Sequence, residues 1–478
     1  MNKYITLVIF LIPQYIPAME ESRNFKPSEI NCLFMCSDPN VYKTPKGGAP
    51  ILGEIEAHGE DYDTALERHL EQFKSNPSNL ETTKKLLCIL GALGKVATVR
   101  DVYSAIPEAY REDRYILYTL AYALKTEGKM SEAIKVLEKI YYKNPEDPVA
   151  SANLGFAYLA NGNFEQGWPL YLKEKKHSSL LREWLMNGVS LKGKKISIDA
   201  TNVGIGDVLH FIGFVHELKQ RGAFVRFISP RSMKTIISRC TNFIDVVQLK
   251  KEEDPIEYDA ETPIMTLPAL FNVTEKTISR DGPYINPDNE LVKKWRKKLA
   301  HDHNLKIGFI LNASLYNDEF RPLIERRTVP LEKFLELGKI KGISLYSLQQ
   351  KPELPLDRFE LISCNNGIET YVLKGSPEVQ FHIFDDAFDK ESGPFMDSAA
   401  VMKNLDIVIA PPTASAHLAG EVGVETFLIL KKVTDWRWPV NKETPTWYPH
   451  AKLFKEKRPF DLDSVFERIK AEIEKKLT

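Results

Sequence analysis

The sequence predicts a chain of mixed class, in which an N-terminal all-helical region is followed by two α/β domains built on parallel sheets. Its 478 residues exceed what one ordinary hydrophobic core requires, so two or three domains are expected. Glycines recur at a 34-residue spacing in the N-terminal third, which is typical of helical repeats. From Lys194 onward short apolar segments alternate with helical ones, and this alternation predicts parallel strands joined by crossover helices.

The predicted repeats occupy residues 61–176, and each unit is a pair of amphipathic helices. The glycines and leucines that recur every 34 residues are Gly94, Gly128, Gly162, Leu86, Leu120 and Leu154. The Asn76-Pro77 pair returns two periods later as Asn144-Pro145, where the proline stops the second helix of a unit. This is the tetratricopeptide period, and about three units are needed to bury a continuous core. Such a region either supports the rest of the chain or presents a concave surface to a peptide partner.

Residues 177–300 form the first predicted α/β domain. Its strands are the apolar segments "KKISIDA", "AFVRFIS", "FIDVVQL" and "TPIMTLP", which begin at Lys194, Ala223, Phe243 and Thr262. The charged stretch at residues 291–304 then forms a polar linker, whose lysines are typical of a solvated helix face.

Residues 301–478 form the second predicted α/β domain. Its strands are "KIGFIL", "ISLYSLQ", "RFELIS", "DIVIA" and "TFLIL", and a final helix is expected from about Asp463. Two such series joined by a polar linker predict two Rossmann-like domains that face each other across a cleft.

The first candidate site lies in "DATNVGIGDVLHF", which is predicted as a strand, a turn and a helix. Gly204 and Gly206 permit a tight turn and the close approach of a substrate to the backbone. Asp207 stands beyond the carboxyl end of the strand, where ligands of open parallel sheets bind. A carboxylate at a helix N-terminus is also a common cap, so the position is compatible with a chemical role and with a structural one.

The second candidate site is the loop "APPTASAH", residues 410–417, in the equivalent place of the second domain. Its uncharged small residues lead from a strand into a helix whose first amides point back toward the cleft. Together with the hydroxyls of Thr413 and Ser415, these amides form a compact anion cradle that suits a diphosphate. His417 either donates to a phosphate oxygen or is a hydrogen-bonded core histidine.

These segments resemble a known family. "GDVLHFIGFV" is similar to the Gly-Asp motif of the bacterial heptosyltransferase-like glycosyltransferases of family nine, whose two Rossmann-like domains form the GT-B fold. The second half, including "APPTASAHLAGEVGVETFLIL", "DWRW" and "WYP", resembles the transferase domain found behind tetratricopeptide repeats in bacterial proteins. More distantly, it resembles the protein O-linked N-acetylglucosamine transferases. The resemblance covers the chain from about Asp61 to its C-terminus, and it implies helical repeats followed by a GT-B pair with an N-terminal acceptor domain and a C-terminal donor domain.

The resemblance also implies roles for individual residues. Asp207 matches the general base that takes the proton of the acceptor hydroxyl as the sugar leaves a nucleoside diphosphate. Thr413 and His417 match the loop that binds the donor diphosphate. Arg326 and Arg327 match a basic position where a guanidinium neutralises the leaving diphosphate, although each is also compatible with a surface ion pair.

Asp397 matches an acidic position of the donor site, and its alternative role is a helix cap. The chain departs from the family pattern in the donor loop. Where an acidic residue followed by Thr-Ser is usual, this chain has Pro412, Thr413 and Ala414, which removes a carboxylate and a hydroxyl. The departure leaves open a second hypothesis, in which a degenerate transferase domain serves as the scaffold of a repeat-protein adaptor. A third hypothesis is a sugar-nucleotide epimerase of the same fold, but this function would leave the helical repeats without a role.

The predicted activity is therefore glycosyl transfer from a nucleotide-sugar donor to a glycan, lipopolysaccharide or protein acceptor, with the repeats assisting acceptor binding. No cofactor is expected, because "GIGD" lacks the third glycine of a dinucleotide fingerprint. No metal is expected either, because Asp461 and Asp463 open a helix and are explained by capping. A further group of aromatic residues either lines a base or acceptor pocket or packs against the domain core: Trp436, Trp438 and Trp447.

Charge and cysteine content narrow the class of partner. The chain has 64 Lys and Arg against 65 Asp and Glu, so there is no global electrostatic basis for binding nucleic acid or an anionic membrane surface. The five cysteines are odd in number and mostly scattered, and Cys32 with Cys36 supplies at most half a zinc site. Free thiols are therefore expected.

The N-terminus leaves two locations open. Residues 1–19 combine Lys3, a short apolar run and Ala18 at a cleavage point, which is typical of a secretory signal, and residues 20–60 follow as an extension. The run is too short to span a bilayer. The odd cysteine count and the need for a nucleotide sugar made in the cytoplasm oppose export, and a cytoplasmic location is our expectation.

Overall fold

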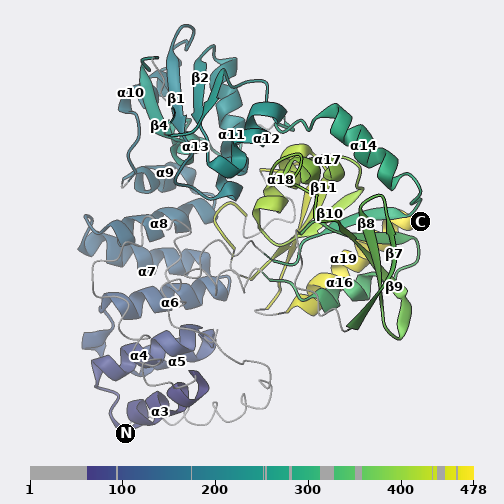
Figure 1. The fold of residues 1–478 in the computed structure, drawn as a ribbon. Helices are drawn as coiled ribbons and strands as arrows, with labels where there is room; N and C mark the ends of the chain where they lie inside the picture. Colours follow the sequence, from purple (N-terminus) through teal and green to yellow (C-terminus); the bar gives the residue numbers. More distant parts are fainter. Residues whose placement is uncertain are drawn as a thin grey trace. The chain divides into compact units, whose positions relative to one another are not determined.

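The structure is a computed structural model, and it divides the chain into two compact units (Figure 1). It describes residues 62–92, 95–173, 175–250, 252, 256–278, 282–312, 328–349, 358–432, 434–438, 447–458 and 461–478. The first unit contains Met1–Glu174, Leu315–Arg326 and Lys432–Val440, and the second contains Lys175–Ser314, Arg327–Lys431 and Asn441–Thr478. The predicted leader at residues 1–19, the extension at 20–60 and the cysteines Cys32 and Cys36 lie outside the described residues.

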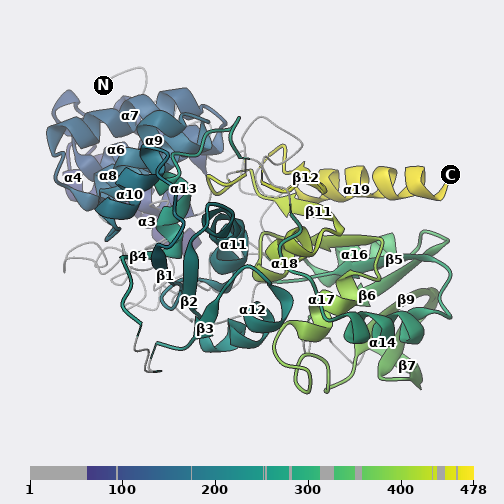
Figure 2. The same cartoon turned by 90° about the horizontal axis from the view of Figure 1, so that it is seen from above.

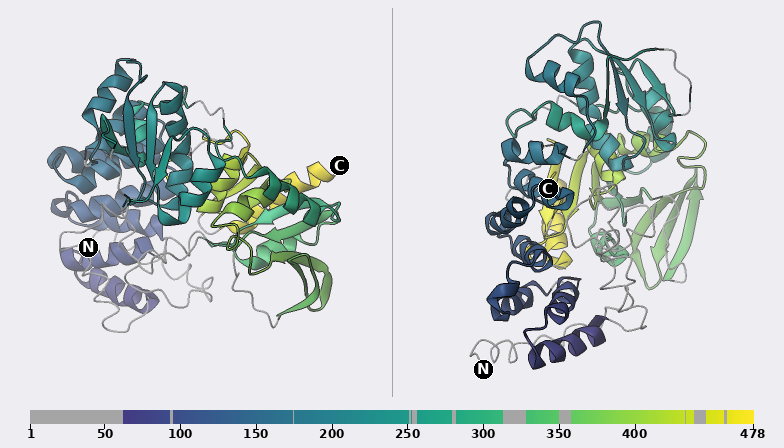
Figure 3. Two further views of the ribbon diagram at one scale, coloured as in Figure 1. Left: turned by 45° about the horizontal axis from the view of Figure 1, so that its top comes forward. Right: turned by 90° about the vertical axis from the view of Figure 1, so that its left-hand side faces the viewer.

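The first unit is helical in its described part. Its helices are α3 (Tyr62–Ser75), α4 (Leu80–Ala92), α5 (Val96–Ala105), η3 (Glu108–Tyr110), α6 (Arg114–Thr126), α7 (Met130–Lys143), α8 (Pro148–Ala160) and α9 (Phe164–Leu172). Each α-helix packs against the next along the chain, and Figure 3 shows them following one another. The apolar faces of α3 to α6 share one core, in which Leu86, Val102 and Ala123 are buried.

The 34-residue recurrence in the sequence appears as recurring helix ends. Asp113 caps α6 by accepting hydrogen bonds from the amides two and three positions further along, and Asp147 caps α8 in the same way one period later. Gly128 follows α6 with a φ of 84°, and Gly162 follows α8 with a φ of 80°. Glycine is the residue that adopts this left-handed conformation at little cost, so these glycines end the two helices.

A short segment from the C-terminal half belongs to this helical unit. Trp436 is 6% exposed, and its ring centroid lies 5.5 Å from that of Trp168 and 6.0 Å from that of Tyr171, both in α9. Burial lowers the pKa of Lys125 in α6 to about 7, and the charge of Asp435 partly offsets this effect. Residues 434–438 are therefore part of the packed core of the helical unit.

The second unit contains two sheets, of which the smaller, sheet A, is four-stranded and parallel. Its strands are β1 (Lys195–Asp199), β2 (Phe224–Ile228), β3 (Val246–Gln248) and β4 (Ala260–Pro263), in the order β3-β2-β1-β4. The helices of this region are α10 (Ser179–Met186), α11 (Ile205–Gln220), η4 (Arg231–Met233), α12 (Lys234–Cys240), η5 (Ile264–Thr266) and α13 (Leu267–Leu270).

The prediction of a strand at residues 262–268 is wrong for most of this segment. The strand begins earlier and ends at Pro263, and the chain continues as η5 and α13. Proline lacks the amide that a strand ladder uses, and Pro268 lies in the first turn of α13, where proline is tolerated.

The larger sheet, sheet B, has eight strands in the order β12-β11-β10-β5-β6-β9-β8-β7. They are β5 (Leu305–Phe309), β6 (Ile343–Ser347), β7 (Phe359–Asn365), β8 (Ile368–Leu373), β9 (Ser376–Phe384), β10 (Ile407–Ala410), β11 (Glu425–Leu430) and β12 (Ala451–Lys455). Its described helices are α14 (Asn289–Leu299), α16 (Leu331–Leu337), α17 (Met396–Met402), α18 (Ala414–Val422) and the C-terminal α19 (Leu462–Leu477), which Figure 2 shows at the end of the chain.

Sheet B is mixed, although the sequence pattern predicted a parallel sheet. β7, β8 and β9 pair antiparallel, while β9 pairs parallel with β6. Asn366 and Gly367 have φ values of 53° and 78° and join β7 to β8, which is the turn chemistry of a tight hairpin. The strand at "RFELIS" is therefore the edge of a meander, and β8, β9 and β12 are strands that the sequence analysis did not identify.

The predicted linker at residues 291–304 overlaps α14, whose basic residues are exposed as expected except Lys298, which is half-buried. Trp295 on the same helix is buried at 2% exposure, which ties the helix to the domain core. Cys88, Cys240 and Cys364 are free thiols, in agreement with the prediction for the cysteines that the structure describes. Across the described ranges, no helix is both long and apolar enough to cross a membrane.

Candidate active site

Both sheets of the second unit have the doubly wound order that creates a binding crevice. In sheet A the chain moves from β1 to β2 on one side and later to β4 on the other, so the order reverses at β1. In sheet B the order reverses between β5 and β10, which pair in parallel. Ligands of such sheets bind beyond the carboxyl ends of the strands at the reversal point. The helices that follow β1 and β10 are α11 and α18, the two that carry the predicted site residues.

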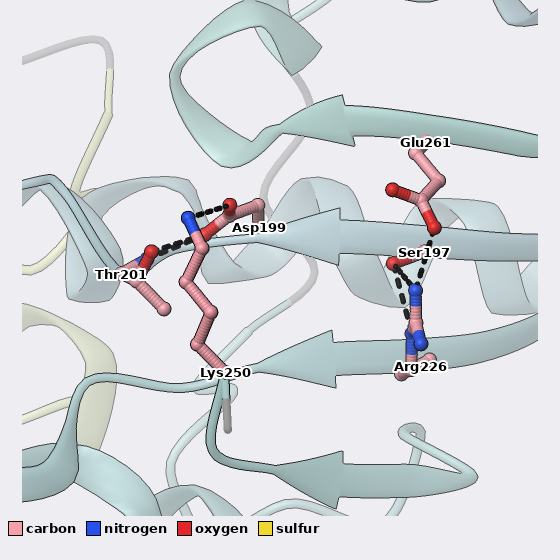
Figure 4. A network of polar contacts seen from close by, with 6 residues as sticks. All are labelled: Ser197, Asp199, Thr201, Arg226, Lys250 and Glu261. Atoms are coloured by element: carbon pink, nitrogen blue, oxygen red, sulfur yellow. Dashed lines mark hydrogen bonds and ion pairs between the residues drawn. The ribbon is translucent and has the colours of Figure 1, made fainter. Parts of the chain in front are cut away.

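The turn that leads from β1 to α11 is held by a small polar network (Figure 4). Asp199 at the end of β1 accepts hydrogen bonds from the backbone amide of Thr201 at 2.8 Å and from its hydroxyl at 2.6 Å. Lys250, which follows β3, forms an ion pair with Asp199 at 3.4 Å. Partial burial favours the protonated acid, but the Thr201 hydrogen bonds and the Lys250 charge outweigh it and lower the pKa of Asp199. Asp199 is therefore an anion that fixes the path of the chain toward α11.

A second network in Figure 4 ties the strands of sheet A together. Arg226 of β2 is 8% exposed, donates to Ser197 of β1 at 2.7 Å and forms an ion pair with Glu261 of β4 at 2.7 Å. Its guanidinium also lies 3.8 Å from the ring centroid of Tyr258. These contacts span three strands and hold β1 in place, the strand that delivers the chain to the candidate site.

The first turn of α11 contains the predicted Gly204, Gly206 and Asp207. Gly204 is the N-cap of the helix, and Asp207 lies half-buried in its first turn. A Cβ atom on Gly204 would lie 3.1 Å from a carboxylate oxygen of Asp207, so this side chain bends back over the helix N-terminus. The arrangement stabilises the carboxylate through the helix dipole, which leaves both predicted roles of Asp207 in place.

The first turn of α18 contains the predicted Thr413, Ser415 and His417. Thr413 is the N-cap, is 6% exposed and accepts a hydrogen bond from the amide of Ala416 at 3.4 Å. Ser415 is half-buried in the same turn. Because α18 follows the strand at the reversal point of sheet B, its first amides lie at the carboxyl end of that sheet.

The two helix N-termini meet. α11 packs against α18, and a Cβ atom on Gly206 would lie 3.0 Å from Cδ2 of His417 and 3.6 Å from the Cα of Ala414. Only a residue without a side chain lets the backbones approach this closely. The structure therefore brings the first turn of α11, with Gly204, Gly206 and Asp207, against the first turn of α18, with Thr413, Ser415 and His417, and each helix follows a strand of a different sheet.

His417 is held by a residue that the sequence analysis did not single out. Its Nδ1 lies 2.9 Å from the hydroxyl of Tyr448, and the same hydroxyl lies 3.0 Å from Nδ1 of His210 on α11. The exposed fractions of His210, His417 and Tyr448 are 0%, 7% and 3%. The only sequence signals for this cluster are the position of His210 one turn after Asp207 and the presence of Tyr448 in the "WYP" segment.

The remaining predicted residues are not brought into this group. Asp397 lies in the first turn of α17, is 2% exposed, and accepts hydrogen bonds from Nε1 of Trp295 at 2.7 Å and from the amide of Asp389 at 3.0 Å. These contacts are structural, but they are not those of the helix cap that the sequence left open for Asp397, because the N-cap of α17 is Phe395 and the amide bound by Asp397 belongs to Asp389. Arg326 and Arg327 lie outside the described residues.

The tryptophans pack in cores, which was one of the two predicted alternatives. Trp447 is 2% exposed, and its ring lies 4.8 Å from that of His210 and 6.4 Å from that of Phe211, measured between centroids. Trp436 and Trp438 are 6% and 2% exposed in the helical unit. In the part of the chain that the structure describes, no group of three or more His, Cys, Asp or Glu residues is arranged to hold a metal ion.

Asp389 gives a pH-dependent prediction. Burial raises its pKa from 3.8 to about 6, against the opposing effect of hydrogen bonds from Ser398. The folded state thus retains this proton where the unfolded chain has lost it, so the stabilisation is full below pH 3.8 and disappears as the pH rises through 6. The free energy of unfolding should therefore fall by about 2 kcal/mol over this interval. Asp389→Asn should lack this part of the slope in urea unfolding series, whereas Glu378→Gln, at an exposed carboxylate of β9, should keep it. An unchanged slope in Asp389→Asn would contradict the prediction.

Comparison with known proteins adds similarity of fold only. No protein-family model and no curated protein matches the chain. Among solved structures, a family 9 glycosyl transferase from Veillonella parvula is similar at 12% identity and a TM-score of 0.42, covering 60% of this chain and 97% of its own. The ADP-heptose lps heptosyltransferase II of E. coli is similar at 11% identity and a TM-score of 0.35, covering 60% and 100%. A variant of the Thermobaculum terrenum O-GlcNAc transferase is similar at 11% identity and a TM-score of 0.26, and the match covers 88% of each chain.

Both groups that the sequence motifs resemble are thus represented among the similar structures.

Proposed function

We propose that this chain is a glycosyltransferase of the GT-B type, which moves a sugar from a nucleoside-diphosphate donor to a hydroxyl of a glycan, lipopolysaccharide or protein acceptor. One observation carries the proposal. The first turns of α11 and α18, each at the reversal point of its own sheet, pack against each other around Gly206 and His417. A ligand at this junction would be in reach of residues from both sheets, as transfer between two substrates requires.

The donor side of the proposed site is α18. Its N-terminal amides and helix dipole favour a diphosphate. The hydroxyl of Ser415 and the imidazole of His417 lie in the same turn and would donate hydrogen bonds to phosphate oxygens. The contact would strengthen as negative charge develops on the leaving nucleoside diphosphate, which is how such a site accelerates transfer.

The acceptor side of the proposed site is the first turn of α11. Asp207 would take the proton of the attacking hydroxyl while the bond from the sugar to the diphosphate breaks. This proton transfer makes the hydroxyl oxygen a better nucleophile at the moment of attack. The proposed reaction uses the helix dipole and side-chain donors in place of a metal ion, so chelation should leave it intact.

The helical unit would support the transferase or select its acceptor as a set of tetratricopeptide repeats. The recurrence of Asp113 and Asp147 as caps, and of Gly128 and Gly162 as left-handed stops, supports this assignment. The alternative function is a scaffold with an inactive transferase domain, and Pro412 and Ala414 in the donor loop favour it.

A nucleotide titration separates the two functions. The chain is titrated with UDP, GDP, ADP, CMP and dTDP, with and without EDTA, while thermal unfolding is followed. One nucleotide should stabilise the protein saturably and independently of EDTA, by about 2.7 kcal/mol at a hundred times its dissociation constant. If none of the five nucleotides stabilises the protein, the result would contradict the proposed donor site and favour the scaffold function.

A matched pair of variants locates the binding. Thr413→Ala removes the N-cap hydroxyl of α18, and Ser178→Ala removes that of α10, which accepts from Leu181. Each should cost about 1 kcal/mol of stability. Only Thr413→Ala should also weaken the nucleotide, because only this cap lies in the proposed donor loop.

A further inference from the structure

The hydroxyl of Tyr448 links the two helices of the candidate site at a single atom. It lies 2.9 Å from Nδ1 of His417 on α18 and 3.0 Å from Nδ1 of His210 on α11. Gly420 makes this position accessible to the ring, since a Cβ atom there would lie 2.5 Å from Cδ1 of Tyr448. The absence of a side chain at one position of α18 thus lets an aromatic ring pack against the helix and reach both histidines.

A hydroxyl group has one hydrogen, so it cannot donate to both imidazoles. If it donates to Nδ1 of one ring, it must accept from an N–H at Nδ1 of the other. Two neutral rings bound in this way have opposite tautomers. Two imidazolium rings would each donate to the oxygen, but the ring centroids are 5.0 Å apart in a buried position, and two positive charges there would repel each other strongly.

The choice between the two arrangements matters for the site because of the way His417 is oriented. Its Cδ2 lies 3.0 Å from the position of a Cβ on Gly206, so the edge of the ring that carries Cδ2 and Nε2 faces the first turn of α11. When Tyr448 donates to Nδ1 of His417, the proton of that ring is on Nε2, at this edge. In the other arrangement Nε2 presents a lone pair, which repels an anion.

We propose that Tyr448 and His210 are positioning residues that hold His417 in the tautomer with its proton on Nε2, so that it donates to a diphosphate bound at the N-terminus of α18. His210 then carries its proton on Nδ1 and donates to the oxygen of Tyr448. This inference rests on the proposed donor site, and it adds to it a specific requirement: the preference for a diphosphate depends on a hydroxyl that does not itself touch the ligand. No proton is gained or lost by the protein in this arrangement.

The test combines a spectroscopic readout with a binding one. The full chain is labelled with ¹⁵N-histidine, and the imidazole nitrogens of His210 and His417 are assigned with His210→Gln and His417→Gln variants. The wild-type spectrum should show His417 with its proton on Nε2 and His210 with its proton on Nδ1 at neutral pH, whether or not nucleotide is present; the reverse assignment would overturn the proposal. Tyr448→Phe, which keeps the ring and removes only the hydroxyl, should show mixed tautomers for His417.

Binding of the nucleotide found in the titration should weaken about three- to tenfold in Tyr448→Phe, the effect of losing one neutral hydrogen bond. The matched control is Tyr346→Phe, which also removes a buried hydroxyl, there bonded to Asp302 at 2.7 Å, and which should bind nucleotide as wild type does. The same tautomer in both rings, or unchanged binding by Tyr448→Phe, would overturn the proposal. If wild type binds no nucleotide, the spectra still decide the tautomers, and the failure belongs to the proposed function.

Discussion

The Asp207→Asn variant is expected to lose transfer activity by about 10²- to 10⁴-fold in kcat while binding the donor nucleotide nearly as tightly as wild type. An asparagine has almost the same size and still lies at the N-terminus of α11, but it cannot accept the proton of the acceptor hydroxyl. The diphosphate is assigned to α18, so the loss should appear in the chemical step and not in donor binding. The measurement is a kinetic comparison with the donor identified by titration, together with its dissociation constant.

The control must separate catalysis from the interaction of a carboxylate with the helix dipole. Asp463 lies exposed in the first turn of α19 and pairs with Lys333 at 2.6 Å, so Asp463→Asn removes a carboxylate from a helix N-terminus that carries none of the candidate site residues. Both variants should lose about 0.5 kcal/mol of stability from this source. If Asp207→Asn retains full activity, Asp207 is a cap and the base lies elsewhere. A joint loss of folding and nucleotide binding would also assign it a structural role.

The sequence predicts those features of the site that depend on neighbours along the chain. A strand, a small turn and a helix recur at residues 195–220 and again at 407–422, and each places polar residues at a strand end by local geometry alone. The meeting of Gly206 with His417 could be expected only through the family resemblance. Periodicity identifies which face of a helix is apolar, but it does not specify which other helix that face contacts.

Features that depend on distant pairs are missing from the sequence prediction. His210 and Tyr448 are 238 residues apart, and Trp295 and Asp397 are 102 apart, so no local pattern connects them. The family resemblance placed Asp397 in the donor site, whereas its bonding partner Trp295 lies on the helix that the sequence predicted as a solvated linker. The β7–β8 hairpin is a different case, because Asn366-Gly367 is a local hairpin signal that conflicts with the expectation of parallel strands.

Trp436→Ala is expected to destabilise the helical unit by about 3–5 kcal/mol, the cost of removing a buried large aromatic side chain. Its ring packs edge-on against Trp168 and Tyr171 of α9, so the variant leaves a cavity beside two aromatic residues. The matched control is Tyr142→Ala on α7, whose ring is 68% exposed and whose loss should change stability by less than about 0.5 kcal/mol. Urea unfolding followed by circular dichroism measures both.

Amide hydrogen exchange then shows whether residues 434–438 and α9 stabilise each other. In Trp436→Ala, exchange should accelerate in α9 and in residues 434–438, because these two segments stabilise each other, while β1 and β2 of sheet A should keep their protection. Such a result would assign this face of the repeats to the chain's own segment, which favours the support role over a peptide-binding groove at that position. If Trp436→Ala unfolds like wild type, the segment contributes nothing to the helical unit, and the face that includes Trp168 is available to a peptide partner.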